Sequence, residues 1–421
     1  MKIQKVRSAF YIALRYLLGR AREGGRYLRG AAAGIALSLI PVVVTLIVSD
    51  GMIRGITDRY LELGTGHLQV HNFQGDDIFP VEEMMDLPGV RGAWMERHGI
   101  AVIYGADGSS GATIRAVEPS FWDDEGSRRY LDVLAGKGKP ETNRDLLLGD
   151  ELARSIGAAV GSTVRIMTFN ITPSGRPIPR VNSFVVAGIV SSGYRELDAL
   201  WCIMTLDAGR QVLPEASRTH LMLKIDDPYN EAAYMARSLN NILGPAYGVY
   251  TWMTLQYHQY SSYQSTRQLL LFIMALIVLV AAVNVSSATS MLVIERQREI
   301  AILKTSGAKP FFTSGIFLCG AFLTGLTGSV FGIAAGLAIG SSVNTLIRGL
   351  ETILSFFSSL VRAGPVTILD ASFYLETIPI IINWEFVFLI ALYTILCSVL
   401  ASWLPARRAG RLKPIDILRK Y

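Results

Sequence analysis

The sequence of 421 residues lacks the motifs by which most enzymes are recognised. It contains no G-x-x-x-x-G-K-[ST] segment, which would cradle nucleotide phosphates, and no G-x-S-x-G or H-E-x-x-H segment. Of its three cysteines, Cys319 and Cys397 sit in apolar runs and Cys202 stands alone, so neither a disulfide framework nor a metal cluster is available. His67 and His71 have no third ligand nearby and indicate a surface pair rather than a metal site. We therefore expect no catalytic residues, no bound metal and no cofactor in this chain.

Acidic residues are almost missing from the long apolar runs, where Glu385 lies at an edge. Ion-coupled transporters need ionisable groups inside the membrane, so this absence argues against that class. The net charge of +6 raises the possibility of nucleic-acid binding. However, residues 53–266 carry more Asp and Glu than Lys and Arg, and the basic excess flanks the apolar runs. That distribution fits membrane topology and predicts no nucleic-acid partner.

Long hydrophobic runs are what the sequence does have, within a composition that is 51% hydrophobic. Four of them are long enough to cross the hydrocarbon core of a bilayer, which is about 30 Å thick. They cover residues 30–52, 267–293, 311–347 and 384–404. The remaining segments are 1–29, 53–266, 294–310, 348–383 and 405–421. This pattern predicts a membrane α-helical protein with four transmembrane helices and a large α+β domain inserted between helices 1 and 2.

Lys and Arg set the expected orientation. They crowd residues 1–29, 294–310 and 405–421, whereas the 348–383 loop has only Arg348 and Arg362. The positive-inside rule then places both termini and the 294–310 connector in the cytoplasm. We expect a multi-pass inner-membrane protein whose large domain lies outside, in the periplasm.

A row of glycines marks the third span. Gly328, Gly332, Gly336 and Gly340 recur every four residues and lie near one face of a helix. Small residues in such a row let another backbone approach closely, which predicts a tight helix–helix contact. The sequence does not say whether that second helix belongs to the same chain.

The inserted domain alternates strand-like and helix-like patterns. HLQVH, GIAVIYG, STVRIMTF and SFVVAGIV are typical of strands, and DLLLGDELARSIGAAVG and NEAAYMARSLNNILG of amphipathic helices. Between two of the strands lies ITPSGRPIPR (171–180), whose three prolines predict a stiff hairpin loop rather than regular structure. Such a loop is either a plain surface turn or a recognition loop, because stiffness lowers the entropy cost of docking a partner.

The connector IERQREIAILKTSGAKP (294–310) is short and charged, yet carries apolar side chains. Its charges keep it in water, while Ile300, Ala301 and Leu303 are expected to enter a groove on a cytoplasmic partner. Gly307 should end the helix, and Pro310 lies where the third span begins.

Several stretches resemble one family. VIERQREIAILKTSGAKP is similar to the coupling segment of FtsX/MacB-like permeases of ABC transporters, whose usual form is ERRREIAILRTLGA. The tail WLPARRAGRLKPIDILRK resembles the closing motif of that superfamily. FYIALRYLLGRAR, DLLLGDELARSIGAAVGSTVRIM and ITPSGRPIPRVNSFVVAGIVSSGYRELDALWCIMTL resemble the LolC/LolE-type lipoprotein-releasing permeases. TGHLQVHNF is closer to the wider MacB-like group.

The resemblance implies a function. The chain would be a permease subunit that extracts lipoproteins from the outer leaflet of the inner membrane. It would pair with a second permease subunit, identical or different, and with a LolD-like ATPase that binds ATP and Mg. A LolA-like periplasmic carrier would receive the lipoprotein. A MacB-like permease exporting peptides, toxins or drugs, and an FtsX-like regulator of cell-wall hydrolysis, remain open as alternatives.

The resemblance also assigns candidate residues. ATPase coupling falls on Glu295, Arg296, Arg298, Glu299, Ile302, Leu303, Lys304 and Gly307. The carrier-binding hook falls on Pro173, Gly175, Arg176, Pro177 and Pro179. Each CH₂ group that leaves the membrane lipid loses about 0.8 kcal/mol of stabilisation. The acyl chains of the lipoprotein therefore need an apolar site on the permease. For that site we expect Leu39, Val43, Leu46 and Val280 on the first two spans.

Overall fold

The computed structural model describes residues 8–15, 25–74, 77–171, 177–214, 217–360 and 377–412, which fall into two compact units. The helical unit comprises Met1–Gly51, Gln264–Leu350 and Pro379–Tyr421, and the sheet unit comprises Met52–Tyr263 and Glu351–Ile378. The sheet unit is thus formed mainly by the segment that the sequence predicts as an inserted domain. Hook candidates Pro173, Gly175 and Arg176 lie outside the described residues.

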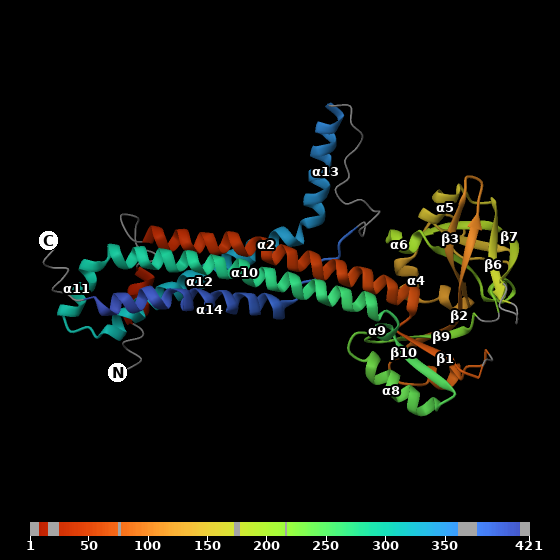
Figure 1. The fold of residues 1–421 in the computed structure, drawn as a ribbon, viewed down its shortest axis with the longest axis horizontal. Helices are drawn as coiled ribbons and strands as arrows, with labels where there is room; N and C mark the ends of the chain where they lie inside the picture. The colour runs from red at the N-terminus through yellow and green to blue at the C-terminus, as the bar shows by residue number, and fades with distance from the viewer. Residues whose placement is uncertain are drawn as a thin grey trace. The chain divides into compact units, whose positions relative to one another are not determined.

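Four helices are long and apolar enough to cross a membrane. They are α2 (Gly25–Arg59), α10 (Tyr257–Glu295), α12 (Pro310–Ser341) and α14 (Trp384–Arg411), and they run side by side in Figure 1. At 1.5 Å per residue α10 alone is about 58 Å long, roughly twice the hydrocarbon thickness. The apolar run at 267–293 is therefore only the middle of a longer helix.

Residues 8–15 are also helical, and two further shorter helices lie in the described part of the helical segments. The helix α11 (Gln297–Thr305) joins α10 to α12, and α13 (Val343–Leu360) follows α12 after Ser342. The third span, which the sequence predicts as continuous over 311–347, is interrupted there. The helix α13 also occupies part of the predicted 348–383 loop.

The helices pack through an apolar core drawn from all four spans. Ile35 and Leu39 of α2 contact Val278 and Ala281 of α10, and Ala321 of α12 joins the same cluster. A second cluster, at the α11 end of the bundle, contains Phe317, Ala406 and Ala409.

The sheet unit contains one mixed sheet with ten strands among the described residues. The strands are β1 (Leu68–Asn72), β2 (Val90–Tyr104), β3 (Ser109–Val117), β4 (Asp132–Gly136), β5 (Asp145–Gly149), β6 (Thr163–Ile171), β7 (Pro177–Ser191), β8 (Trp201–Thr205), β9 (Thr219–Ile225) and β10 (Tyr247–Thr251). Their order is β10-β1-β9-β2-β3-β8-β5-β7-β4, and β6 pairs with β2 and β7. Two pairs are parallel, β3 with β8 and β5 with β7, and the others are antiparallel.

Short helices cover and connect the strands. They are η1 (Tyr60–Thr65, a π-helix), α3 (Val81–Met85), η2 (Pro119–Trp122), α4 (Glu125–Tyr130), α5 (Asp150–Ile156), α6 (Arg195–Asp198), α7 (Leu206–Val212), α8 (Ala232–Leu243) and α9 (Trp252–Leu255). The α+β character expected of the inserted domain is confirmed.

Most of the quoted strand patterns lie in strands, and NEAAYMARSLNNILG contains α8 as expected. DLLLGDELARSIGAAVG is different, because its first five residues form β5 and only Asp150–Ile156 is helical. Leu146, Leu147 and Leu148 are all fully buried, since β5 lies between β7 and β8. A central strand buried on both faces loses its alternation, and its apolar run then imitates a helix.

Candidate functional site

The connector folds as a short helix with two different faces. Ile300 and Ala301 are both buried within this chain, and Ile300 belongs to the cluster that includes Phe317 and Ala406. The expectation that these two side chains enter a partner's groove is therefore wrong. An apolar face on a short helix can dock on its own chain as well as on another, and the sequence does not distinguish the two.

The other face of the connector is exposed. Arg298, Ile302 and Thr305 of α11 are exposed and follow one another at steps of four and three residues, and Glu295, the last residue of α10, is exposed as well. Side chains at these steps line one side of a helix. Ile302 is 54% exposed, and this apolar side chain lies between charged and polar ones. Of the coupling candidates, Arg298 and Ile302 form this face, and Glu295 lies just before it at the end of α10.

The remaining coupling candidates fix the connector in place. Lys304 Nζ donates to the carbonyl oxygens of Gly410 (2.6 Å) and Leu412 (2.7 Å), at the end of α14. Carbonyls at a helix C-terminus have no partner within the helix, so a lysine there caps them. Arg296 pairs with Glu299 within the connector. Gly307 has φ +90°, a conformation that glycine adopts without strain, and it ends α11. Leu303 is half-buried.

The glycine row of α12 faces α2 of the same chain. A Cβ atom built on Gly332 would lie 2.9 Å from Ala36 Cα, and one on Gly336 would lie 2.7 Å from Val43 Cβ. The outer members behave alike, because Gly328 meets Ile35 and Gly340 meets Ile47. Backbones this close leave no room for any side chain at these positions.

The acyl-chain candidates divide into two groups. Leu39, Val43 and Leu46 are buried within this chain, the first two beside the glycine row. Val280 is 64% exposed on α10. Of the four candidates, Val280 alone presents an exposed apolar side chain, and the role of all four residues stays a prediction.

The hook candidates Pro177 and Pro179 belong to a strand. They pair with Ile171 and Phe169 of β6 in an antiparallel ladder. The expectation of a loop over the whole of 171–180 is therefore wrong for Ile171, which ends β6, and for the last four residues, which begin β7. Both prolines lie in the part of β7 that pairs with β6, before the part that pairs with β5. Their alternate spacing puts both missing N–H groups on one side of the strand. The structure thus supports a stiff hairpin, whose role in binding a carrier stays a prediction.

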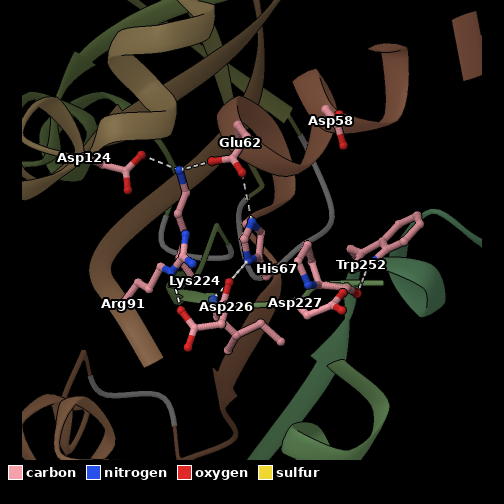
Figure 2. A network of polar contacts seen from close by, with 12 residues as sticks. Asp58, Glu62, His67, Arg91, Asp124, Lys224, Asp226, Asp227 and Trp252 are labelled. Carbon is pink, nitrogen blue, oxygen red and sulfur yellow. Dashed lines mark hydrogen bonds and ion pairs between the residues drawn. The ribbon is translucent and has the colours of Figure 1, made fainter. Parts of the chain in front are cut away.

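A network of buried charges joins η1 to the sheet (Figure 2). Lys224 of β9 is almost fully buried, and its Nζ contacts Glu62 of η1 and Asp124 before α4. His67 Nε2 lies 3.2 Å from Glu62 Oε1, and its Nδ1 lies 3.0 Å from Ile225 N. The segment that directly follows α2 along the chain is therefore tied to the middle of the sheet by ion pairs. We refer to Glu62, His67, Asp124 and Lys224 as the joint.

The joint corrects the expectation for His67, which is buried rather than at the surface. His71 stacks on His220 with ring centroids 4.0 Å apart, so it too has partners. Burial lowers the pKa of His71, and burial with the neighbouring His71 lowers the pKa of His220 to about 4. Among the described residues no group of three His, Cys, Asp or Glu side chains could hold a metal ion.

Sequence reasoning missed the joint entirely. Lys224 lies 162 residues from Glu62 and 100 from Asp124, so no spacing in the sequence relates them. The π-helix η1 is a rare type of element that is frequent at functional positions. It marks this segment in the structure, but it is not visible in the sequence.

A second buried charge cluster lies within the sheet. Glu96 of β2 is fully buried and accepts hydrogen bonds from Arg115 (2.6 and 2.9 Å), His98 (2.6 Å) and Trp94 (3.2 Å). Burial alone would raise the pKa of Glu96, but Arg115 and His98 outweigh it and lower that pKa to about 2. The carboxylate is thus held ionised inside the sheet.

Two family models match this chain. The MacB-like periplasmic core domain matches residues 30–238, and the FtsX-like permease C-terminal matches residues 271–414. The first covers α2 and most of the sheet unit, and the second covers the remaining spans with α11. A sheet-bearing domain between the first two spans and a helical connector between the next two define an FtsX/MacB-like permease.

Within that class the chain is related to the LolC/LolE-type permeases of lipoprotein-releasing systems. It is 29% identical to the lipoprotein-releasing system transmembrane protein LolC of Xylella fastidiosa, over 97% of this chain and 98% of that protein. It is 27% identical to LolC of Neisseria meningitidis serogroup B over the same shares. It is 22% identical to LolE of Haemophilus influenzae over 98% of this chain and 99% of that protein.

A solved structure of the periplasmic region of MacB from Actinobacillus actinomycetemcomitans also aligns with this chain. The alignment covers 47% of this chain and 94% of that one, at 14% identity and a TM-score of 0.29. A score this low supports no conclusion about a shared fold.

Proposed function

We propose that this protein is the permease subunit of an ABC transporter that extracts lipoproteins from the outer leaflet of the inner membrane. The observation that carries the proposal is similarity over nearly the whole chain to permeases named for lipoprotein release. The MacB-like export and FtsX-like regulatory alternatives rest on matches to parts of the chain alone.

In this proposal the energy comes from a LolD-like ATPase that holds ATP and Mg, and it enters through the exposed face of α11. That face is short and combines an apolar side chain with charged and polar ones. It is flanked by Arg and Lys residues, which the positive-inside rule places in the cytoplasm. Both termini would then be cytoplasmic and the sheet unit periplasmic. In this proposal, work done on α11 passes to α14 through the Lys304 cap. Along the chain, α2 continues into η1, which the joint ties to β9.

The proposal includes a second permease subunit, identical or different, and a LolA-like carrier that takes the lipoprotein. The hairpin of β6 and β7 is the surface we assign to that carrier. Its stiffness reduces the entropy lost on docking.

The decisive experiment substitutes Ile302, the exposed apolar residue of the coupling face. A buried interface anchor contributes 2 kcal/mol or more, so Ile302→Glu should weaken co-purification of the ATPase by about tenfold or more. The matched control is Ile242→Glu on α8, whose side chain is 58% exposed in the sheet unit. This variant should retain the ATPase.

Release itself is measured in proteoliposomes that contain the complex and a triacylated lipoprotein. Addition of ATP should transfer the lipoprotein to a soluble carrier with wild-type protein and with Ile242→Glu, but not with Ile302→Glu. ATP hydrolysis without any transfer would show that the cargo is not a lipoprotein.

A further inference from the structure

The sheet unit contains a pocket of about 770 Å³, whose lining includes Arg115 and His98 of the Glu96 charge cluster. Its walls come from η1, β2, β3, the α6–β8 turn and the start of α10. Its volume lies within the range of pockets that bind small ligands and short peptide segments. We call it the Arg115 pocket, after the residue that carries the argument.

Arg115 is 2% exposed, and one of its nitrogens has no partner among the residues that the structure describes. Its Nε and Nη2 donate to Glu96, and its guanidinium lies over the Trp201 ring, 4.7 Å from the centroid. These contacts fix its orientation. Nη1 is buried and has no hydrogen-bond acceptor within the described part of the chain. A buried donor left unpaired is costly, so a ligand that supplies an acceptor stabilises the pocket.

The charges around the pocket favour a neutral acceptor over an anion. Glu96 already neutralises Arg115, and Glu196 adds a carboxylate to the pocket wall. A phosphate or sulfate would therefore meet no net positive charge. A carbonyl oxygen accepts from Arg115 Nη1 without this repulsion.

The rest of the lining matches a peptide. Gln256 has no side-chain partner among the described residues, and Gln259 donates to the Tyr60 hydroxyl (3.2 Å), which leaves its carbonyl oxygen available. An amide side chain both donates and accepts, as a peptide group does. Leu200 and Leu255 add apolar surface for side chains.

We propose that the Arg115 pocket binds a short extended peptide segment of the cargo polypeptide. A backbone carbonyl of the peptide accepts from Arg115 Nη1, and its backbone N–H groups donate to Gln256 and Gln259. The proposal rests on the proposed function only for the source of the peptide. The chemistry of the pocket requires an uncharged polypeptide backbone and no particular sequence.

The test uses the full chain assembled with its ATPase in nanodiscs. A photo-crosslinking benzoylphenylalanine replaces Leu200, which lines the pocket and is 48% exposed, or Leu134 of β4, which is 54% exposed and outside it. The probe is a biotinylated hexapeptide of Ala, Ser and Gly with a C-terminal amide. We expect at least tenfold more crosslinking at position 200 than at position 134. Equal crosslinking at the two positions would overturn the proposal.

Two further measurements distinguish specific binding in the pocket from non-specific contact with the probe. The double variant Gln256→Ala and Gln259→Ala should reduce crosslinking at least fivefold, whereas Gln211→Ala on the exposed face of α7 should not change it. Inorganic phosphate at 10 mM should not compete with the probe. Competition by phosphate, or equal effects of the two sets of glutamine variants, would contradict a neutral peptide ligand.

The same preparation distinguishes this proposal from the proposed function. Probe crosslinking without ATP-driven lipoprotein transfer would leave the pocket standing and refute lipoprotein release. Lipoprotein transfer without crosslinking at position 200 would refute the peptide-binding pocket and leave lipoprotein release standing.

Discussion

Replacing Lys224 by Met should loosen the joint between η1 and β9. The change removes the Lys224 ammonium that lies between Glu62 and Asp124 and leaves the two carboxylates without it. Breaking a fully buried ion pair costs about 3–5 kcal/mol. Both carboxylates keep some exposure to water, so we expect about 2 kcal/mol here. That loss corresponds to roughly 30-fold faster local opening, since 1.4 kcal/mol is a factor of ten.

Hydrogen exchange of the full chain in detergent measures this opening. Backbone amides of residues 60–65 and 219–225 should exchange roughly 30-fold faster in Lys224→Met, while those of α8 should not change. Lys137→Met is the matched control, because Lys137 pairs with Glu141 at an exposed surface and such pairs contribute little.

A second variant separates charge from packing. Adding Glu62→Gln to Lys224→Met removes one of the two unpaired carboxylates, so exchange should slow again. If Lys224→Met behaves like Lys137→Met, the joint does not hold η1 to the sheet, and the reasoning fails.

Two other predictions concern stability. Gly332→Ala forces a Cβ to within 2.9 Å of Ala36, so we expect a loss of about 1–3 kcal/mol and a lower Tm in detergent. Gly315→Ala on the same helix meets nothing within 4 Å and should stabilise by up to about 1 kcal/mol; a shift of both Tm values in one direction would contradict the packing argument. Glu96 binds a proton more weakly in the folded state than in the unfolded state, because its pKa falls from 4.5 to about 2. Its contribution, about 3 kcal/mol, is complete above pH 4.5 and is lost as the pH falls towards 2. Denaturant unfolding followed by tryptophan fluorescence should show this slope in wild type, and a Glu96→Gln variant that keeps it would exclude Glu96 as the cause.

The spans and the class of the inserted domain could be predicted because they rest on strong local signals. Runs such as 384–404 exceed the length of any ordinary buried strand or core helix, and α8 shows a clear helical period. Residues 145–149 were predicted as part of a helix but form the strand β5. This error arose because Leu146–Leu148 show no alternation of apolar and polar residues that would distinguish a strand from a helix.

The candidate site was only partly predictable. The connector's position between two spans was visible in the sequence. Which of its apolar residues stay exposed depends on the burial of Ala301 and on the packing of Ile300 against α12 and α14. The joint and the Arg115 pocket depend on strand pairings between distant segments. Arg115 meets Glu96 because β2 and β3 are neighbours, a fact of topology rather than of spacing.

The Lys304 cap has a practical consequence for handling this protein. The two carbonyl groups that the lysine holds, on Gly410 and Leu412, belong to the last stretch of α14 and the residue that follows it. Truncating the chain before these residues would release the connector from its anchor, even though every residue of the connector remained. Affinity tags and reporter fusions are therefore better placed away from the C-terminus. A tag at the C-terminus would lie only a few residues from the carbonyl groups that anchor the connector.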